Sequence, residues 1–160
     1  MSLEKDGLIL KDPRWVLTGR SPDPALFFGA LLDLVPVGVL LFLEGGSRPS
    51  ELRRLIDLFK VDVALRPALG TRWPRQEYIT LRALPAVMEE MARLTARLPV
   101  REICSHLHVF DGDRVFLEGY DAFRNPFRLS GFIEERRLEV FCKAIGCGYQ
   151  ELEREWPDQR

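Results

Sequence analysis

The spacing of apolar residues changes along this chain, and each spacing predicts one kind of element. From Ala25 to Leu43 the apolar residues form a nearly continuous run. Asp23 is a suitable N-cap and Pro24 suits a first helical position, so we predict a helix at Ala25–Leu34. The following residues, Val37–Leu43, are apolar on both strand faces, which predicts a central strand buried on both sides.

Helical and strand patterns then alternate along the rest of the chain. Leu52, Leu55, Ile56 and Phe59 recur with the helical period, which predicts a helix that packs by one stripe. The other predicted elements are strands at Gly7–Leu10, Val61–Leu65 and Glu77–Leu81, helices at Leu84–Leu98 and Ile133–Ile145, and one helical turn within Gln150–Trp156. Gly146, directly after the last helix, is typical of a C-terminal cap.

The segment from Ile103 to Phe123 gives the best-defined local prediction, a β-hairpin. Polar and apolar residues alternate on both sides of the turn at 111–113. A two-residue loop would mix polar and apolar side chains on both faces, whereas a three-residue loop gives one apolar face. We therefore expect the three-residue loop, which places His106 opposite Glu118 and leaves the rings of His106 and His108 on the half-exposed face.

The order of these elements predicts an α+β fold. From Val37 to Phe110 the chain reads strand, helix, strand, strand, helix, strand, which is the order of a split βαβ or ferredoxin-like sandwich. The hairpin adds one C-terminal strand, and further helices flank the unit. The alternative is a three-layer α/β fold with the flanking helices on the second face. By its length, the chain of residues 1–160 is expected to form a single globular domain.

Composition and charge exclude several classes of partner. Lys and Arg number 23 against 24 Asp and Glu, the net charge is -1, and the sequence contains no long basic cluster. Such a chain lacks the positive field that holds a protein on nucleic acid. It also lacks the glycine patterns of nucleotide-binding loops, so no cofactor is predicted. Three cysteines are too few for a disulfide framework, which favours a reducing compartment.

The apolar run from Ala25 to Leu43 is long enough to resemble a membrane span. Asp33 near its centre would cost about 2.5 to 3.5 kcal/mol in a bilayer, and Pro36 divides the run. We therefore expect two buried elements and no membrane contact. The first ten residues carry acidic side chains and a very short apolar run, unlike a secretory signal, so a cytoplasmic location is expected.

Two histidines provide the first candidate for chemistry. The His-x-His pair of His106 and His108 places both rings on one strand face, beside Glu118 in the expected register. Two imidazoles and a carboxylate can bind a metal ion or transfer protons, although an ordinary polar sheet face has the same sequence pattern. A variant combines His106 with the three cysteines Cys104, Cys142 and Cys147 as the four ligands of a structural zinc ion. Free cysteines are more often simply buried.

The second candidate is the loop of Gly45, Gly46, Ser47 and Arg48. It follows the predicted central strand and precedes a helix, where free backbone N–H groups and the helix dipole favour anions. The loop matches no known phosphate-binding pattern, so a plain turn is the competing interpretation.

Aromatic residues crowd the region between the hairpin and the last helix, interleaved with arginines. They are Phe110, Phe116, Tyr120, Phe123, Phe127 and Phe132, with Arg114, Arg124 and Arg128 between them. Protein interfaces favour both residue types. If the second hairpin face is not covered within the monomer, another chain should cover it.

Two functions of different classes follow. The first is a non-catalytic domain that acts by protein-protein binding, or as a homo-oligomer, through the hairpin and its aromatic flank. The alternative is a small enzyme or ligand-binding protein with an anion site at Gly45–Arg48 and an acid-base or metal site at His106, His108 and Glu118. No coherent catalytic set occurs in the sequence, which favours the first and leaves open whether the protein is an enzyme.

Overall fold

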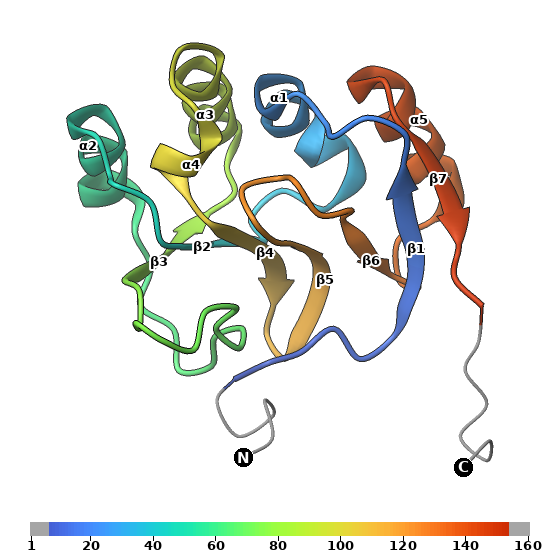
Figure 1. The fold of residues 1–160 in the computed structure, drawn as a ribbon, viewed down its shortest axis with the longest axis horizontal. Coiled ribbons are helices and arrows are strands. Elements are labelled where there is room, and N and C mark those ends of the chain that lie inside the picture. The colour runs from blue at the N-terminus through green and yellow to red at the C-terminus, as the bar shows by residue number, and fades with distance from the viewer. Residues whose placement is uncertain (1–6, 154–160) are drawn as a thin grey trace.

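The computed structural model describes residues 7–153. A seven-stranded antiparallel sheet forms the centre of this part of the chain. Its strand order is β3-β2-β4-β5-β6-β1-β7. The strands are β1 Pro13–Thr18, β2 Leu40–Glu44, β3 Tyr78–Arg82, β4 His106–Asp111, β5 Arg114–Gly119, β6 Arg128–Ser130 and β7 Gly148–Glu151. The helices are α1 Pro24–Leu34, α2 Ser50–Phe59, α3 Pro85–Arg97, α4 Val100–Ile103 and α5 Glu135–Ile145. These helices all lie on one side of the sheet (Figure 1).

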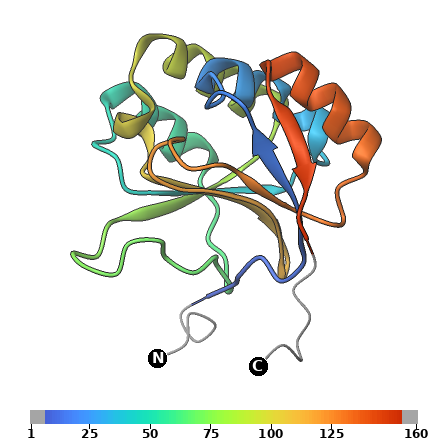
Figure 2. The same ribbon diagram turned by 45° about the vertical axis from the view of Figure 1, so that its right-hand side comes forward.

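The main hydrophobic core lies between the sheet and these helices. One face of the central strands contributes buried aliphatic side chains, namely Leu41, Leu43, Leu107, Val109 and Leu117. α1 packs beside α3 on one flank and α5 on the other, which closes the helical layer over them (Figure 2). Alternate residues of β2 and β4 therefore point into this core, as the period of a strand requires.

The opposite face of the sheet is covered by irregular chain. Residues 60–77, which connect α2 to β3 and which we call the covering segment, run beneath the sheet (Figures 1 and 2). Leu8 connects the N-terminal part of the described chain to this segment. Its N–H donates to the carbonyl of Arg66 and its carbonyl accepts the N–H of Ala68, both at 2.8 Å. A second, smaller core forms here from Leu10, Leu40, Phe42, Phe110 and Val115.

Most of the predicted helices and the central strand are confirmed. In α1, Asp23 is the N-cap and its carboxylate accepts the Ala25 N–H at 3.0 Å. All five residues of β2 are buried, as expected for a strand covered on both faces. α5 ends at Gly146, which adopts the left-handed conformation with φ 74°.

Predictions near the sheet edges were wrong. Val61–Leu65 is not a strand, because the side chains of Val61 and Val63 pack against the second core. The preceding residue, Lys60, makes only an isolated bridge to Leu81. Gly7–Leu10 likewise pairs only through an isolated bridge of Leu8 to Pro67.

The flanks of the sheet also differ from the prediction. The tail was expected to be helical from Gln150, but it forms β7 because it pairs with β1; residues 154–156 lie outside the described range. β1 and β6 were not predicted, since their sequences are short and do not alternate cleanly. The three-layer alternative is wrong, because the described helices occupy one face only, whereas the α+β class is confirmed.

The long apolar run divides as the sequence predicted. Its first part is α1 and its second part is β2, with Pro36 in the connection between them. Within residues 7–153, the structure has no helix with the length and apolar character needed to cross a bilayer.

Phe27 of α1 lies at the centre of an aromatic cluster in the main core. It is fully buried, and four rings surround it with centroid distances of 4.8 to 5.6 Å, those of Phe28, Phe123, Phe127 and Phe141. This cluster joins α1 to α5 and to the chain that follows the hairpin.

We expect Phe27→Ala to lower the free energy of unfolding by about 3 to 5 kcal/mol, because it removes a large buried ring and leaves a cavity. Urea unfolding monitored by circular dichroism measures the change. Val140→Ala, at an exposed position of α5, is the control and should change stability by no more than about 0.5 kcal/mol. Similar losses in the two variants would contradict this description of the core.

Candidate functional site

The hairpin register places the two histidines differently from the prediction. His108, not His106, lies opposite Glu118, and Phe110 lies opposite Val115. The predicted three-residue loop is wrong, because Asp111 pairs with Arg114 around a two-residue turn. Phe116 has no partner and forms a bulge, which restores one apolar face further along the hairpin. The histidines and Glu118 therefore share a face, as predicted, in a different pairing.

That face is not half-exposed, as the sequence suggested. His106 is 7% exposed and His108 only 2% exposed. The covering segment and residues 8–10 lie over them, so the monomer itself covers the second face of the hairpin. A face that the chain covers on its own does not require another protein to bury it.

A buried carboxylate, that of Glu44, anchors the covering segment to the sheet. Glu44 is the last residue of β2, is fully buried, and pairs with His106 across the sheet. Its two oxygens accept backbone N–H groups of Gly70 at 2.7 Å and Thr71 at 2.9 Å. Hydrogen bonds to a charged acceptor are stronger than neutral ones, so this contact fixes the covering segment in place.

His106 is part of the same anchor. Its Nδ1 accepts the backbone N–H of Asp121 at 3.2 Å, so the ring proton is on Nε2, which donates to the Thr71 hydroxyl at 2.8 Å. Gly70 lies against the ring, and a Cβ at that position would come within 2.6 Å of it. With both nitrogens engaged, His106 holds the covering segment and has no free atom for a ligand.

His108 begins a chain of polar groups that crosses β4, β5 and β6. The Tyr120 hydroxyl donates to Glu118 at 3.1 Å, so it accepts from Nε2–H of His108 at 3.2 Å. Arg128 of β6 completes the chain through its ion pair with Glu118 at 3.4 Å. Nδ1 of His108 is buried and has no hydrogen-bond partner among residues 7–153.

Burial sets the protonation of this chain. It lowers the pKa of His108 to about 3, with a smaller contribution from the neighbouring His106. Burial raises the pKa of Glu118, although the hydrogen bond from Tyr120 and the charge of Arg128 act against the rise. The pKa of Tyr120 is raised by burial and then by the charge of Glu118. At neutral pH His108 is therefore an uncharged donor within the chain.

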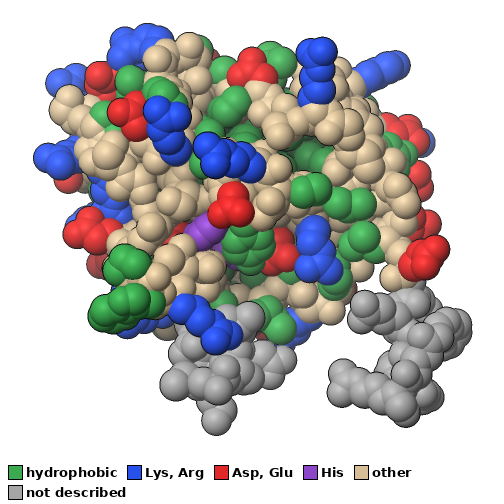
Figure 3. Space-filling model, in the orientation of Figure 1, with side chains coloured by type: hydrophobic (Ala, Val, Ile, Leu, Met, Phe, Trp, Pro, Cys, Tyr) green, Lys and Arg blue, Asp and Glu red, His purple; other side chains and the backbone are tan. Residues whose placement is uncertain are grey.

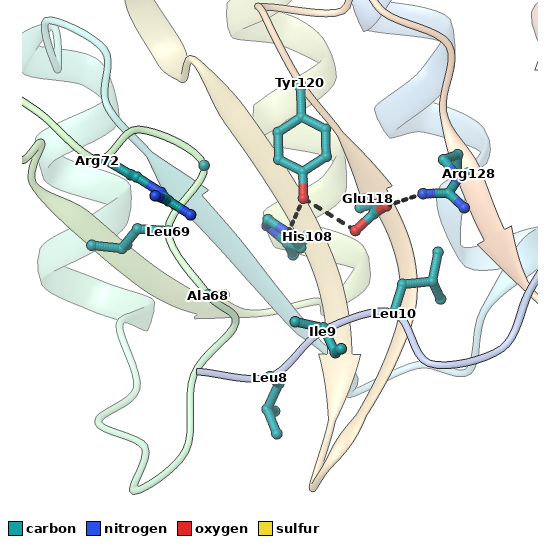
Figure 4. A pocket seen from close by; sticks show the side chains of 11 residues that line it. Leu8, Ile9, Leu10, Ala68, Leu69, Arg72, His108, Glu118, Tyr120 and Arg128 are labelled. Carbon is teal, nitrogen blue, oxygen red and sulfur yellow. Dashed lines mark hydrogen bonds and ion pairs between the residues drawn. The ribbon is translucent and has the colours of Figure 1, made fainter. Parts of the chain in front are cut away.

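These polar groups form one wall of a cavity of about 440 Å³ between the sheet and the covering segment. Figure 4 shows Tyr120, His108 and Glu118 in its middle, with Arg72 of the covering segment on one side and Arg128 on the other. The remaining walls are apolar and consist of Leu8, Ile9, Leu10, Ala68 and Leu69. In the space-filling view a small area of histidine is visible near the middle of the molecule, beside apolar and acidic side chains (Figure 3).

The loop of Gly45, Gly46, Ser47 and Arg48 lies directly after Glu44, at a separate hollow beside α2. Its backbone is largely engaged. The N–H of Gly45 donates to the carbonyl of Glu77, and those of Ser47 and Arg48 donate to the carbonyl of Glu102. A Cβ at Gly46 would approach the carbonyl of Ile103 to 2.6 Å, so close packing explains this glycine. Anion binding at the loop stays a prediction.

The proposed metal sites are not formed. Among residues 7–153, no group of three or more His, Cys, Asp or Glu side chains is placed to hold a metal ion. Cys104 packs into the main core, on the other side of the sheet from His106. Burial raises its pKa to about 12, which makes it a poor nucleophile or ligand. Cys142 also lies in the main core, as its position on the apolar stripe predicted.

The predicted aromatic surface is mostly core. Three of its six rings are buried, namely Phe110, Phe123 and Phe127, and two are partly buried, namely Phe116 and Tyr120. Phe132 is the exception at 58% exposed, and the guanidinium of Arg114 lies 3.4 Å from its ring centroid. The aromatic residues therefore support the fold more than they form a docking face.

Sequence reasoning missed the residues that connect the histidines to the rest of the site. Glu44 is not among the predicted candidates, although a carboxylate ending a fully apolar strand is a signal for a buried polar contact. Tyr120 was grouped with the aromatic surface. Thr71 and Arg72 lie in a long loop without a pattern, and only the fold brings them to the histidine face.

The low pKa of His108 makes stability depend on pH. The unfolded chain takes up a proton near pH 6.5 and the native state only near pH 3, so stability is present above pH 6.5 and is lost as pH falls below it. Between pH 7.5 and 5.0 this single group should cost about 2 kcal/mol. Urea unfolding of the wild type and His108→Gln at both values measures it: the wild type should lose about 2 kcal/mol more than the variant. Equal losses would show that His108 is charged in the native state.

Comparison with known proteins identifies no relatives of this chain. No protein-family model matches it, and neither the curated proteins nor the solved structures give a significant match. The functional proposal therefore depends on the residues of the cavity and their geometry.

Proposed function

We propose that this protein binds a small organic molecule in the cavity between the sheet and the covering segment. Ligand sites are typically concave, with mostly apolar walls and a few polar groups that fix orientation. The cavity has this character, since five apolar side chains face the polar chain of His108, Tyr120, Glu118 and Arg128.

The polar chain on a buried sheet face is the observation that carries this proposal. Apolar residues at these positions would extend the second core formed by Phe42 and Phe110. Instead, Nδ1 of His108 is buried with no donor in the described part of the chain, which costs about 1 to 3 kcal/mol. Glu118 loses part of its hydration as well. A stability cost at residues that line a cavity is typical of a site kept for binding.

Binding is better supported than catalysis. A general base should have a pKa near the working pH, whereas the pKa of His108 is lowered to about 3. His106 uses both of its nitrogens to hold the covering segment. The cysteine nearest in sequence, Cys104, faces the opposite core. Glu118 is left as the group of the polar chain that could transfer a proton. The hydroxyl beside it belongs to Tyr120, and burial raises the pKa of that hydroxyl, which makes it a poor nucleophile.

Partner binding or self-association is the second candidate. β7 lies at one end of the sheet, and within residues 7–153 no strand pairs with its outer edge. Val140 of the adjoining α5 is 55% exposed. These features support pairing of two copies through β7. The mass of the protein in solution tests this candidate independently of the cavity.

The same sheet supports the ferredoxin-like description as a further proposal. β2 lies between β3 and β4, with β5 beyond, which is the neighbour relation of a split βαβ unit extended by a hairpin strand. The bridge of Lys60 to Leu81, on β3, occupies the place of the missing edge strand. This relation concerns architecture and implies no particular function.

A fragment experiment tests the cavity. Neutral, anionic and cationic benzene derivatives are titrated into labelled protein, and chemical shifts are followed by NMR. We expect binders to shift the resonances of Leu10, Leu69 and Tyr120, which surround the cavity. Ala68→Phe should abolish binding, because the new ring fills the cavity. Ala64→Phe, exposed on the same covering segment, is the matched control and should leave binding unchanged.

Two results would overturn the proposal. One is that no fragment shifts these resonances at millimolar concentration. The other is that fragments bind equally well to Ala68→Phe and to Ala64→Phe, which would place them elsewhere on the molecule.

A further inference from the structure

We infer that the ligand is an organic monocarboxylate with an apolar body, held by Arg72 through its carboxylate. This inference rests on the proposed binding function and adds the chemical class of the ligand. It follows from the charges that line the cavity, from the shape of the guanidinium group, and from the apolar walls.

The charges of the cavity leave one positive group unmatched. Two arginines, Arg72 and Arg128, line it together with one carboxylate, that of Glu118. Arg128 is already paired with Glu118. Arg72 makes no hydrogen bond or ion pair within residues 7–153, and Figure 4 shows its guanidinium directed toward the middle of the cavity. An anionic group of the ligand would supply the missing partner.

The backbone that carries Arg72 is fixed. The preceding residue, Thr71, is held through its N–H by Glu44 and through its hydroxyl by His106. Arg72 therefore extends from an anchored point of the covering segment, although its side chain is exposed. Fixing the backbone in advance lowers the entropy lost when the guanidinium binds a ligand.

A single carboxylate fits this arrangement better than a phosphate. The planar fork of arginine matches the two oxygens of a carboxylate through parallel hydrogen bonds. A phosphate monoester would bring nearly two negative charges beside Glu118, and like charges at short distance repel. One free arginine balances one negative charge, so a monoanion leaves the cavity neutral.

The apolar walls define the rest of the ligand. Leu8, Ile9, Leu10, Ala68 and Leu69 offer hydrocarbon surface and no charge. An aliphatic or aromatic body would bury its surface there, at about 25 cal/mol for each Å² removed from water. The ligand is thus amphipathic, with its carboxylate at Arg72 and its body against these residues.

Three probes with six carbon atoms and different head-group charges test the charge preference: hexanoate, hexanamide and hexylamine. Their affinities are measured by NMR titration, with the shifts of Leu69 and Tyr120 reporting the cavity. We expect hexanoate to bind at least about tenfold more tightly than hexanamide, the difference of one charge-assisted contact, and hexylamine to bind most weakly. Arg72→Gln should remove the preference for hexanoate, because the affinity for the carboxylate falls far more than that for the amide. Arg75→Gln, exposed on the same segment and outside the cavity, should keep the preference.

The outcomes separate this inference from the proposed function. If hexanoate and hexanamide bind equally, the cavity binds ligands but the carboxylate class is wrong. A preference for hexylamine would assign recognition to Glu118 and overturn the class as well. If none of these probes shifts the cavity resonances although a neutral benzene fragment does, the cavity binds ligands and the amphipathic carboxylate is wrong; if no probe of either kind shifts them, both proposals fail. If Arg72→Lys and Arg72→Gln retain the full preference, another residue recognises the anion and the assignment to Arg72 is wrong.

Discussion

In the described part of the chain, the sheet face opposite the helices depends on one interaction, the acceptance of two backbone N–H groups by the buried carboxylate of Glu44. A buried carboxylate without partners would be strongly unfavourable, and here the amides of Gly70 and Thr71 compensate for the lost water. Glu44 pairs with His106 in the sheet, and the imidazole adds a second contact to Thr71. Together they hold an irregular segment against the sheet face opposite the helices.

The anchor and the cavity divide the polar residues of this face into two groups with different roles. Both carboxylate oxygens of Glu44 and both ring nitrogens of His106 are hydrogen-bonded, and these contacts position the backbone. His108 and Glu118 lie further along the strands, and they line the cavity between the sheet and the covering segment with Tyr120. The two histidines of the His-x-His motif therefore have different roles. His106 contacts the anchored backbone at Thr71, whereas His108 faces the cavity.

The sequence predicts those parts of the molecule that repeat a simple period. α1 and β2 follow from apolar spacing and from the cap at Asp23, and the hairpin's polar and apolar faces follow from alternation. The register failed because the bulge at Phe116 shifts the pairing, and alternation alone gives no signal for an extra residue.

The candidate site was predictable only in part. Alternation placed His106, His108 and Glu118 on one face, which is correct. Their burial depends on the covering segment, whose position is set by contacts between residues far apart in sequence, such as Thr71 with Glu44. No local pattern encodes such a contact. The arginine at 72 gains its place beside the cavity in the same way, from tertiary structure.

Amide hydrogen exchange at Gly70 and Thr71 tests the central role of the Glu44 carboxylate most directly. In the wild type both amides should exchange much more slowly than those of Arg72 and Trp73, which are exposed on the same segment. Glu44→Gln places an amide NH₂ against one of these donors, so protection should fall, while Glu89→Gln on the exposed face of α3 should leave it intact. If the amides of Gly70 and Thr71 exchange as fast as that of Trp73 in the wild type, or keep their protection in Glu44→Gln, the covering segment is not held by this carboxylate.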